Sequence, residues 1–304
     1  MSVKIFNHDH IVQKKHALKS IFHQFPAKMG SAKLRNGVQC AIPYHNYDAN
    51  ALILWGTASA QWVSERILGP WEPILDPQGR ANIALWLVDY KDTVVDPYKE
   101  LIIVFSVRHK TDPAIVVNRP LQQLQLFDDK QAYPYIYKLW LDTQLPIDYG
   151  RELLGCDKYL DEDMELSFSS SEACFSFYHV ADERNSPEPG LLLSGTLQLK
   201  DKLHLRDLID AYGFFRTLGM AKGASNRWHV VTPPGIMSRE DTERYNPIWD
   251  FVYETQPKFT LAQPSDALQF GGELKEMDFV PQLYQHDPHI KAVLLPPHSF
   301  SLID

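Results

Sequence analysis

The stretch ELIIVFSVRH, residues 100–109, is a short and strongly apolar segment that is typical of a β-strand. Comparable segments occur from residue 38 onward, and Pro, Gly, Asn or Asp separates each from the next. Several alternate between apolar and polar residues, which indicates a sheet with one buried face and one wetter face. They are ANIALWLVDY (81–90), AYPYIYKLWL (132–141), ACFSFYHV (173–180), GLLLSGTLQL (190–199), RWHVVTP (227–233) and IKAVLLPP (290–297).

Helical spacing of apolar residues returns in few places, namely 8–25, 147–154 and 205–219. No linker divides the chain, no internal repeat is visible, and the 21 prolines are spread as strand ends require. We therefore predict one β-rich domain, residues 36–304, after an N-terminal helical arm, residues 1–35. The expected class is α+β but mainly antiparallel β, with a closed or strongly curved sheet and a few peripheral helices.

Composition excludes several classes of protein. The net charge of -8 argues against nucleic-acid binding, which needs a basic surface. No apolar run reaches the roughly 18–20 residues of a membrane span, and the N-terminus lacks the apolar core of a secretory signal. The three cysteines, Cys40, Cys156 and Cys174, match no zinc spacing. A cytoplasmic protein with reduced thiols and no membrane or nucleic-acid partner is the simplest interpretation.

Motifs for common chemistries do not occur. The chain has no dinucleotide-binding or P-loop glycine pattern, no G-x-S-x-G and no H-E-x-x-H. The N-terminal histidines lack the acidic or cysteine partners of a metal shell, so no metal site is expected. The acidic run LDEDMEL, residues 160–166, lacks the alternating pattern of a calcium loop and is interpreted as an exposed loop.

Two residues remain as candidates for chemistry. Lys158 ends the segment DYGRELLGCDK (148–158), and Glu100 enters the apolar strand described above. Each has an ordinary alternative, because single lysines and strand-edge glutamates are usually solvated. A group of aromatic residues either lines a pocket or forms plain core. These are Trp86, Tyr133, Tyr135, Tyr137, Trp140 and Trp228.

The segment IDYGRELLGCDKY resembles the active-site segment of the acetoacetate decarboxylase-like superfamily, in which G-R-E precedes a Schiff-base lysine. Gly150, Arg151 and Glu152 match that pattern, and Lys158 falls at the lysine position. The segment PYKELIIVFSV is similar to the one that carries the family's active-site glutamate, which places Glu100 there. The resemblance extends over roughly residues 70–300 and is most specific at 149–158.

The resemblance implies a cone- or barrel-like antiparallel fold, a homo-oligomer, a small oxo-acid substrate and covalent chemistry without an external cofactor. A lysine amine condenses with a ketone to an iminium, which accepts the electron pair released when a β-keto acid loses carbon dioxide. That amine must be neutral, whereas an ordinary lysine, with a pKa of about 10.4, is almost entirely protonated at neutral pH.

The chain departs from the family pattern at three positions. Tyr159 stands where the prototype decarboxylase has a second lysine, and Asp157 stands where the family has proline. The arginine of the family's N-terminal strand has Arg35 as its nearest counterpart. The candidate substrate-binding residues are therefore Arg35, Arg151, Glu152 and Tyr159.

Three functions remain open on these residues. The first is a Schiff-base lyase that decarboxylates a β-keto acid, with Lys158 as nucleophile and Glu100 as acid/base partner. The second is an aldolase–dehydratase or hydratase that uses the same lysine, with Glu100, Glu152 or Tyr159 moving protons. The third is a non-catalytic member of the fold that binds a small molecule.

Overall fold

The computed structural model of the protein describes most of the chain between residues 30 and 301. The described residues are 22, 30–118, 122–128, 131–154, 156, 158–161, 163–179, 189–199, 221–222, 228–231, 235–237, 245–249, 251–255, 258–262, 266–294 and 298–301. The helix expected at 205–219 and nearly all of the helix expected at 8–25 lie outside them, as does Asp157.

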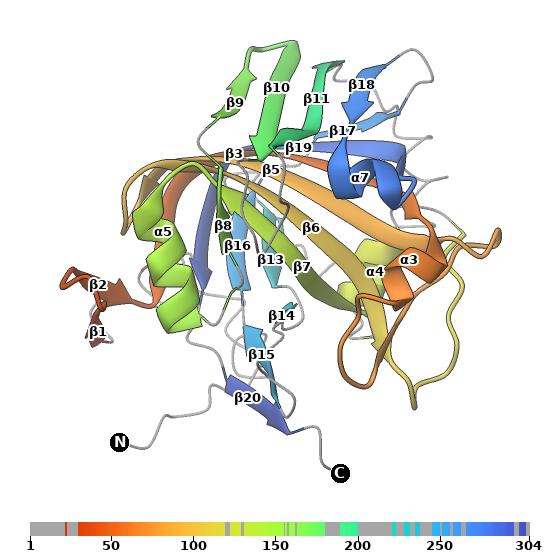
Figure 1. The fold of residues 1–304 in the computed structure, drawn as a ribbon, viewed down its shortest axis with the longest axis horizontal. Coiled ribbons are helices and arrows are strands. Elements are labelled where there is room, and N and C mark those ends of the chain that lie inside the picture. The colour runs from red at the N-terminus through yellow and green to blue at the C-terminus, as the bar shows by residue number, and fades with distance from the viewer. Residues whose placement is uncertain are drawn as a thin grey trace.

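A broad curved sheet runs through the molecule (Figure 1). Among the described residues it has 14 strands, does not close on itself, and is antiparallel except where β8 and β14 pair with β7. In spatial order its main path is β12 (Ala221–Lys222), β13 (Trp228–Val231), β16 (Phe251–Thr255), β19 (Val280–Leu294), β3 (Tyr44–Ala58), β5 (Ala81–Thr93), β6 (Tyr98–His109), β7 (Tyr133–Leu141), β14 (Gly235–Met237), β15 (Tyr245–Trp249) and β20 (His298–Ser301). Off this path, β17 (Lys258–Leu261) pairs with β19, β4 (Trp71–Pro73) with β6, and β8 (Lys158–Leu160) with β7.

Smaller elements surround this sheet. A four-stranded sheet stands over one of its faces in Figure 1, in the order β18 (Ala267–Phe270), β11 (Gly190–Gln198), β10 (Glu172–His179) and β9 (Asp163–Phe168). A separate hairpin consists of β1 (Gly30–Lys33) and β2 (Gln39–Ile42). The described helices are α3 (Ala60–Ser64), α4 (Gln122–Asp128), α5 (Gln144–Tyr149), the π-helix η1 (Gly150–Leu154) and α7 (Gly272–Glu276).

Successive side chains of a strand point to opposite sides of the sheet. In the central strands both sides are buried, because a separate core covers each of them. In β6, Leu101, Ile103 and Phe105 belong to the core that packs against the four-stranded sheet. Ile102 and Val104 belong to a second core on the other face, which α4, α5 and the β1–β2 hairpin cover at its margins. The pocket described below lies on this second face of the sheet.

The structure confirms the seven strands predicted from the sequence and corrects two local interpretations. The acidic run 160–166 is not an exposed loop throughout, because Asp163–Phe168 form β9 and bury Met164 and Leu166 between the two sheets. The helix expected at 147–154 begins earlier, at Gln144, and continues as the π-helix η1. At the end of the expected helical arm, Gly30–Lys33 form a strand.

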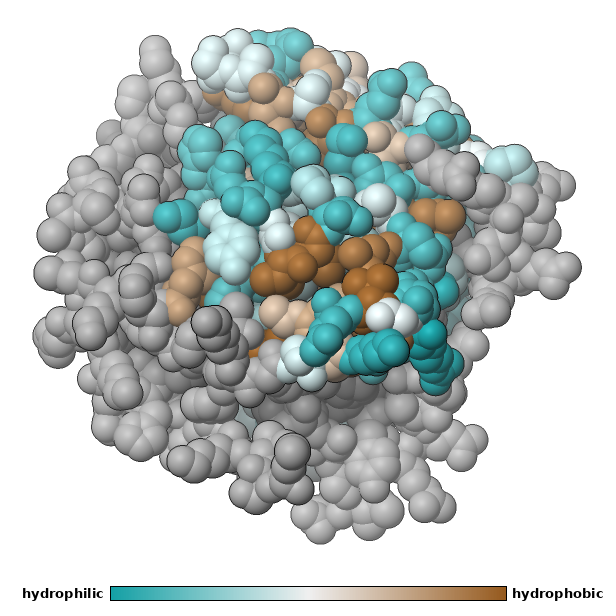
Figure 2. Space-filling view, turned by 90° about the vertical axis from the view of Figure 1, so that its left-hand side faces the viewer, coloured by the Kyte–Doolittle hydropathy of each residue, from teal (hydrophilic) through white to brown (hydrophobic). Residues whose placement is uncertain are grey.

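Among the described residues on the side of the molecule on which α5 and the β1–β2 hairpin lie, hydrophilic residues surround an apolar area near the middle of the view (Figure 2). Within the described part of the chain, no helix is both long and apolar enough to span a membrane.

Candidate active site

A buried lysine–glutamate pair lies beneath the second face of the sheet. Nζ of Lys158 is 2.9 Å from Oε1 of Glu100, within hydrogen-bond distance. The lysine side chain is 7% exposed and the glutamate side chain 3% exposed, so little water reaches either group. Charged residues are rarely buried this far unless they are paired, and buried paired groups in a cleft are candidates for catalysis.

Three strands and one helical turn hold this pair together. Glu100 lies on β6 opposite Leu141 of β7, and Lys158 lies on β8 opposite Leu139 of the same strand. Between β7 and β8 the chain turns through α5 and η1. The guanidinium of Arg151 donates a hydrogen bond to the carbonyl oxygen of Lys158 and so connects this turn to the lysine's own backbone.

Gly150 leaves the room in which the lysine side chain lies. A Cβ atom at this position would be 2.4 Å from Cε of Lys158 and 2.6 Å from its Cδ. Real Cβ atoms essentially never approach another heavy atom this closely, so any side chain here would displace the lysine. The glycine of the GRE motif is thus explained by contact with the lysine eight residues later and not by backbone conformation, since its φ is -63°.

Tyrosine hydroxyls surround the glutamate. Nζ of Lys158 is 5.7 Å from the ring centroid of Tyr98, which stacks on Tyr90 at 4.3 Å between centroids. The hydroxyl oxygens of Tyr98 and Tyr44 are 2.9 Å apart. Burial raises the pKa of all three tyrosines, and the nearby Glu100 carboxylate raises each pKa further. These phenols therefore stay protonated and can donate hydrogen bonds.

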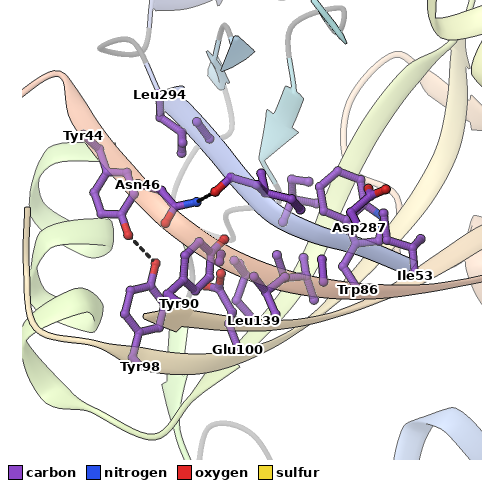
Figure 3. A pocket seen from close by; sticks show the side chains of 17 residues that line it. Tyr44, Asn46, Ile53, Trp86, Tyr90, Tyr98, Glu100, Leu139, Asp287 and Leu294 are labelled. Atoms are coloured by element: carbon purple, nitrogen blue, oxygen red, sulfur yellow. Dashed lines mark hydrogen bonds between the residues drawn. The ribbon is translucent and has the colours of Figure 1, made fainter. Parts of the chain in front are cut away.

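The glutamate opens onto an apolar pocket with a cavity of about 110 Å³. Figure 3 shows Tyr44, Tyr90, Tyr98 and Glu100 at one end of it. The described residues that line it are Tyr44, Asn46, Ala49, Ala51, Ile53, Trp86, Val88, Tyr90, Tyr98, Glu100, Ile102, Ile136, Leu139, Asp287, Ile290, Ala292 and Leu294. An apolar pocket with a few polar groups is the usual form of a small-molecule site.

A comparison with known families finds a match in the segment that carries this pair. Residues 71–162 match the sequence model described as acetoacetate decarboxylase (ADC). The matched region runs from β4 past the end of β8 and includes both Glu100 and Lys158. This segment of the chain is similar to acetoacetate decarboxylase, as its motifs led us to expect.

A solved structure shares its fold, and two others are similar to it at lower TM-scores. A structure of acetoacetate decarboxylase is 12% identical to this chain, covers 86% of it and 91% of its own length, and has a TM-score of 0.50. Acetoacetate decarboxylase from Legionella pneumophila subsp. pneumophila str. Philadelphia 1 is 11% identical, with coverages of 85% and 87% and a TM-score of 0.49. The enduracididine biosynthesis enzyme MppR complexed with pyruvate is 10% identical, with coverages of 86% and 91% and a TM-score of 0.42. No curated protein shows significant sequence similarity to the chain.

Among the residues expected from the acetoacetate decarboxylase-like motif, the structure brings Lys158 and Glu100 together. Arg151 contacts the backbone of Lys158, and the remaining three lie elsewhere. Arg35 is exposed in the turn between β1 and β2, and its backbone N–H donates to Oε2 of Glu152 at 2.9 Å. Glu152 is also exposed and thus joins the hairpin to η1. Tyr159 points to the opposite face of β8 from Lys158, where it packs 6.3 Å from the Trp140 ring.

Other residues of the pocket were not expected from the motif. Tyr98 could have been found, because it lies two residues before Glu100 on the same strand and therefore faces the same side. Asn46 and Asp287 carry no such local signal, since β3 and β19 reach the pocket only through long-range pairing. Of the six aromatic residues proposed as pocket or core, Trp86 lines the pocket, whereas Tyr135 and Trp140 lie in the core on the other face.

Asp161, three residues after Lys158, is fully buried at the end of β8. Its Oδ1 accepts the N–H of Asp163 at 3.2 Å, and no described residue hydrogen-bonds to its Oδ2. Burial raises the pKa of Asp161 to about 7 from an ordinary value of 3.8. Between pH 3.8 and about pH 7, folding is therefore coupled to the uptake of a proton by Asp161. Above about pH 7 the carboxylate is ionised in the folded protein, and this buried charge destabilises the fold.

We expect Asp161→Asn to stabilise the protein more at about pH 8 than at about pH 4, where the native carboxyl is already neutral. The stabilisation at about pH 8 should exceed that at about pH 4 by at most about 4 kcal/mol, since one pKa unit corresponds to about 1.36 kcal/mol. Urea unfolding of both proteins at the two pH values measures it. An equal effect of the substitution at both pH values would contradict the raised pKa.

Proposed function

We propose that the protein is a cofactor-independent Schiff-base lyase in which Lys158 is the nucleophile and Glu100 is its proton-transfer partner. One observation carries this proposal: the two side chains form a buried pair, 2.9 Å apart, and Glu100 lines an apolar pocket. A base within hydrogen-bond distance of a nucleophile activates that nucleophile for covalent catalysis.

The first steps form the iminium. Glu100 accepts a proton from the Lys158 ammonium, and the neutral amine then adds to the carbonyl carbon of the substrate. The resulting carbinolamine loses its hydroxyl group as water, with the proton supplied by Glu100. The nitrogen lone pair forms the C=N bond as the C–O bond breaks, which leaves a positively charged iminium on the lysine.

We propose decarboxylation of a β-keto acid as the reaction that follows. The electron pair of the bond to the carboxylate moves into the iminium, carbon dioxide leaves, and an enamine remains. Protonation of the enamine carbon and hydrolysis by water then release the ketone and regenerate Lys158. Apolar walls favour this direction, because they penalise a carboxylate far more than neutral carbon dioxide. Ile102, Ile136 and Leu139 are among the side chains that form these walls.

A second candidate, aldol or dehydration chemistry on the same lysine, is favoured by the tyrosines. Tyr44, Tyr90 and Tyr98 remain protonated beside a carboxylate, so acidic and basic groups coexist where an enamine would form. Glu100 would remove a proton from the carbon next to the iminium, and a phenol would donate one to a departing oxygen or an incoming carbonyl.

Neighbouring residues have supporting roles in this proposal. We assign Arg151 a positioning role, because its guanidinium binds the carbonyl of Lys158. The contact of Glu152 with the Arg35 backbone supports a structural role for both residues at the margin of the site. A homo-oligomer and a cytoplasmic location remain predictions from the family resemblance and the composition.

Reduction with borohydride in the presence of a β-keto acid such as acetoacetate tests the proposal. We expect a covalent adduct that mass spectrometry maps to Lys158, and we expect neither adduct nor turnover in Lys158→Ala. Lys91→Ala, which removes an exposed lysine from β5, is the matched control and should behave as the unaltered protein does.

The same experiment separates the alternatives. Release of carbon dioxide with the adduct identifies the decarboxylase. An adduct at Lys158 without carbon dioxide, over a panel of β-keto acids, selects the aldol or dehydration reaction. Binding of the oxo compound without any adduct would overturn the proposal and identify a non-catalytic binding protein.

A further inference from the structure

The lysine–glutamate pair lies directly beside an aliphatic wall of the pocket. Lys158 is on β8 and its Nζ reaches Glu100 on β6, so the lysine side chain crosses the intervening strand β7. The residue of β7 opposite Lys158 is Leu139, which lines the pocket. Ile102 also lines the pocket and lies two residues after Glu100, about 7 Å farther along the same face of β6. A substituent on the reacting carbon of a substrate is therefore within reach of both apolar side chains.

The wall continues away from the lysine as a row of apolar side chains. Ile102 lies opposite Leu139 on one neighbouring strand and opposite Trp86 on the other, and Trp86 lies opposite Ile53. In Figure 3, Leu139 lies on the Glu100 side of Trp86 and Ile53. Although they belong to central strands, Ile53 and Ile102 each keep 6% of their surface accessible, as expected where a cavity meets them.

The charges of the lining disfavour a polar occupant at this wall. Among the described lining residues the charged ones are Glu100 and Asp287, which are both acids and repel a carboxylate. Asp287 is only 1% exposed, so it offers little surface to a cation. Any charged or hydrogen-bonding group would also lose its hydration against aliphatic side chains. The part of the substrate that fills this space is therefore neutral and apolar.

The volume of the cavity sets the size of that part. About 110 Å³ is smaller than the roughly 150 Å³ of an apolar cavity that holds one benzene molecule. In proportion to benzene, the space corresponds to about four carbon atoms. This is enough for a short alkyl chain and too little for an extended chain or a ring system.

We propose that Ile53, Trp86, Ile102, Ile136 and Leu139 form an alkyl-binding subsite, and that the substrate is a β-keto acid whose ketone carbon carries a saturated alkyl tail of about four carbon atoms. Each methylene that the subsite removes from water strengthens binding by about fourfold. The residues nearest the reacting carbon, Ile102 and Leu139, then determine which tails fit. This inference rests on the proposed function, because that function places the ketone carbon at Lys158.

Binding of a series of alkyl methyl ketones, measured by ligand-observed NMR titration, tests the subsite. We expect the affinity to rise by about fourfold per methylene from acetone to butyl methyl ketone. Beyond butyl the rise should stop, because longer tails leave the cavity. A hydroxyl group in place of the last methyl group of butyl methyl ketone should weaken binding by about tenfold, because the hydroxyl loses its hydration.

Ile102→Val and Ile103→Val form a matched pair of variants for the same titrations. Each substitution removes one carbon atom from β6, but Ile102 faces the pocket, whereas Ile103 faces the four-stranded sheet. We expect Ile102→Val to extend the rise in affinity by about one methylene, because it enlarges the cavity. Ile103→Val should keep the original dependence on tail length. Substitutions of this size are usually tolerated by a folded core.

The outcomes separate the subsite from the proposed chemistry. NMR titration detects binding whether or not an imine forms, whereas borohydride reports only the imine. A rise in affinity with tail length but no adduct at Lys158 would support the subsite and overturn the proposed function. An adduct at Lys158 with affinities that do not depend on tail length would overturn the subsite alone. A rise that continues unchanged beyond butyl, or the same length dependence in both variants, would also overturn it.

Discussion

Gly150→Ala is expected to reduce both turnover and borohydride trapping at Lys158 by about a hundredfold or more. The added methyl would lie 2.4 Å from Cε of Lys158 and 3.3 Å from its Nζ, so the lysine side chain must leave its present position beside Glu100. A misplacement of about 1 Å can cost about a hundredfold in rate when groups must be aligned. The atoms that give way belong to a flexible side chain, so the fold should be affected much less than the chemistry. Rates of trapping, measured with the melting temperature, check both parts.

Gly190→Ala is the matched control for this substitution. Its added methyl would meet Nε2 of His179 at 3.5 Å, an ordinary van der Waals contact, and it lies in the four-stranded sheet. We expect trapping to be unchanged in this variant. If Gly150→Ala were trapped at the same rate as the unaltered protein, the lysine would not occupy the position described above.

Lys138→Met is expected to destabilise the fold by about 3–5 kcal/mol, the usual cost of leaving one partner of a buried ion pair uncompensated. Nζ of Lys138 is 2.5 Å from Oε1 of Glu273, and their side chains are 11% and 23% exposed. No described residue hydrogen-bonds to Oε2 of Glu273, which makes the loss of its cation more costly. The pair also joins β7 to α7. Urea unfolding measures the change.

Two further variants make this result specific. The Lys99–Asp142 pair is longer, at 3.4 Å, and its lysine side chain is 31% exposed, so Lys99→Met should cost no more than about 1 kcal/mol. Adding Glu273→Leu to Lys138→Met removes the isolated charge and should restore much of the lost stability. An equal cost for both lysine substitutions, or no recovery in the double variant, would argue against an electrostatic cause.

The sequence predicted the strands well because each carries a local pattern. The apolar run at 100–109 and the six segments like it all form strands, since burial of both faces or of alternate residues is visible within one segment. The run at 160–166 was misinterpreted because its charges hide an alternation. Asp163 and Glu165 are exposed, whereas Met164 and Leu166 are buried, which is the pattern of a strand with one wet face.

In the candidate site, too, the residues marked by a local sequence pattern could be predicted and the others could not. Lys158 and Glu100 could be found because a short motif and a strand pattern mark them. The placement of Arg35, Glu152 and Tyr159 depended on geometry that a motif does not contain. Arg35 contributes a backbone N–H to Glu152 and not its charge to the pocket. Tyr159 follows the lysine directly, so on an extended strand it must face the other way.

Asn46 and Asp287 could not be predicted as pocket residues from local sequence. Residues 51 and 287 become partners only when β19 pairs with β3, more than 200 positions apart in the chain. Such a pairing depends on which strands become neighbours in the whole sheet. Neither propensity nor periodicity of a single segment reports it.

The alternation of β6 between its two cores has a consequence for the evolution of this protein. Each side chain that faces the pocket, such as Ile102, has neighbours in the chain that face the four-stranded sheet, such as Leu101 and Ile103. Substitutions that reshape the pocket therefore leave the packing of the other core largely untouched. A lineage can change the molecules it accepts at every second position while the intervening positions preserve the architecture.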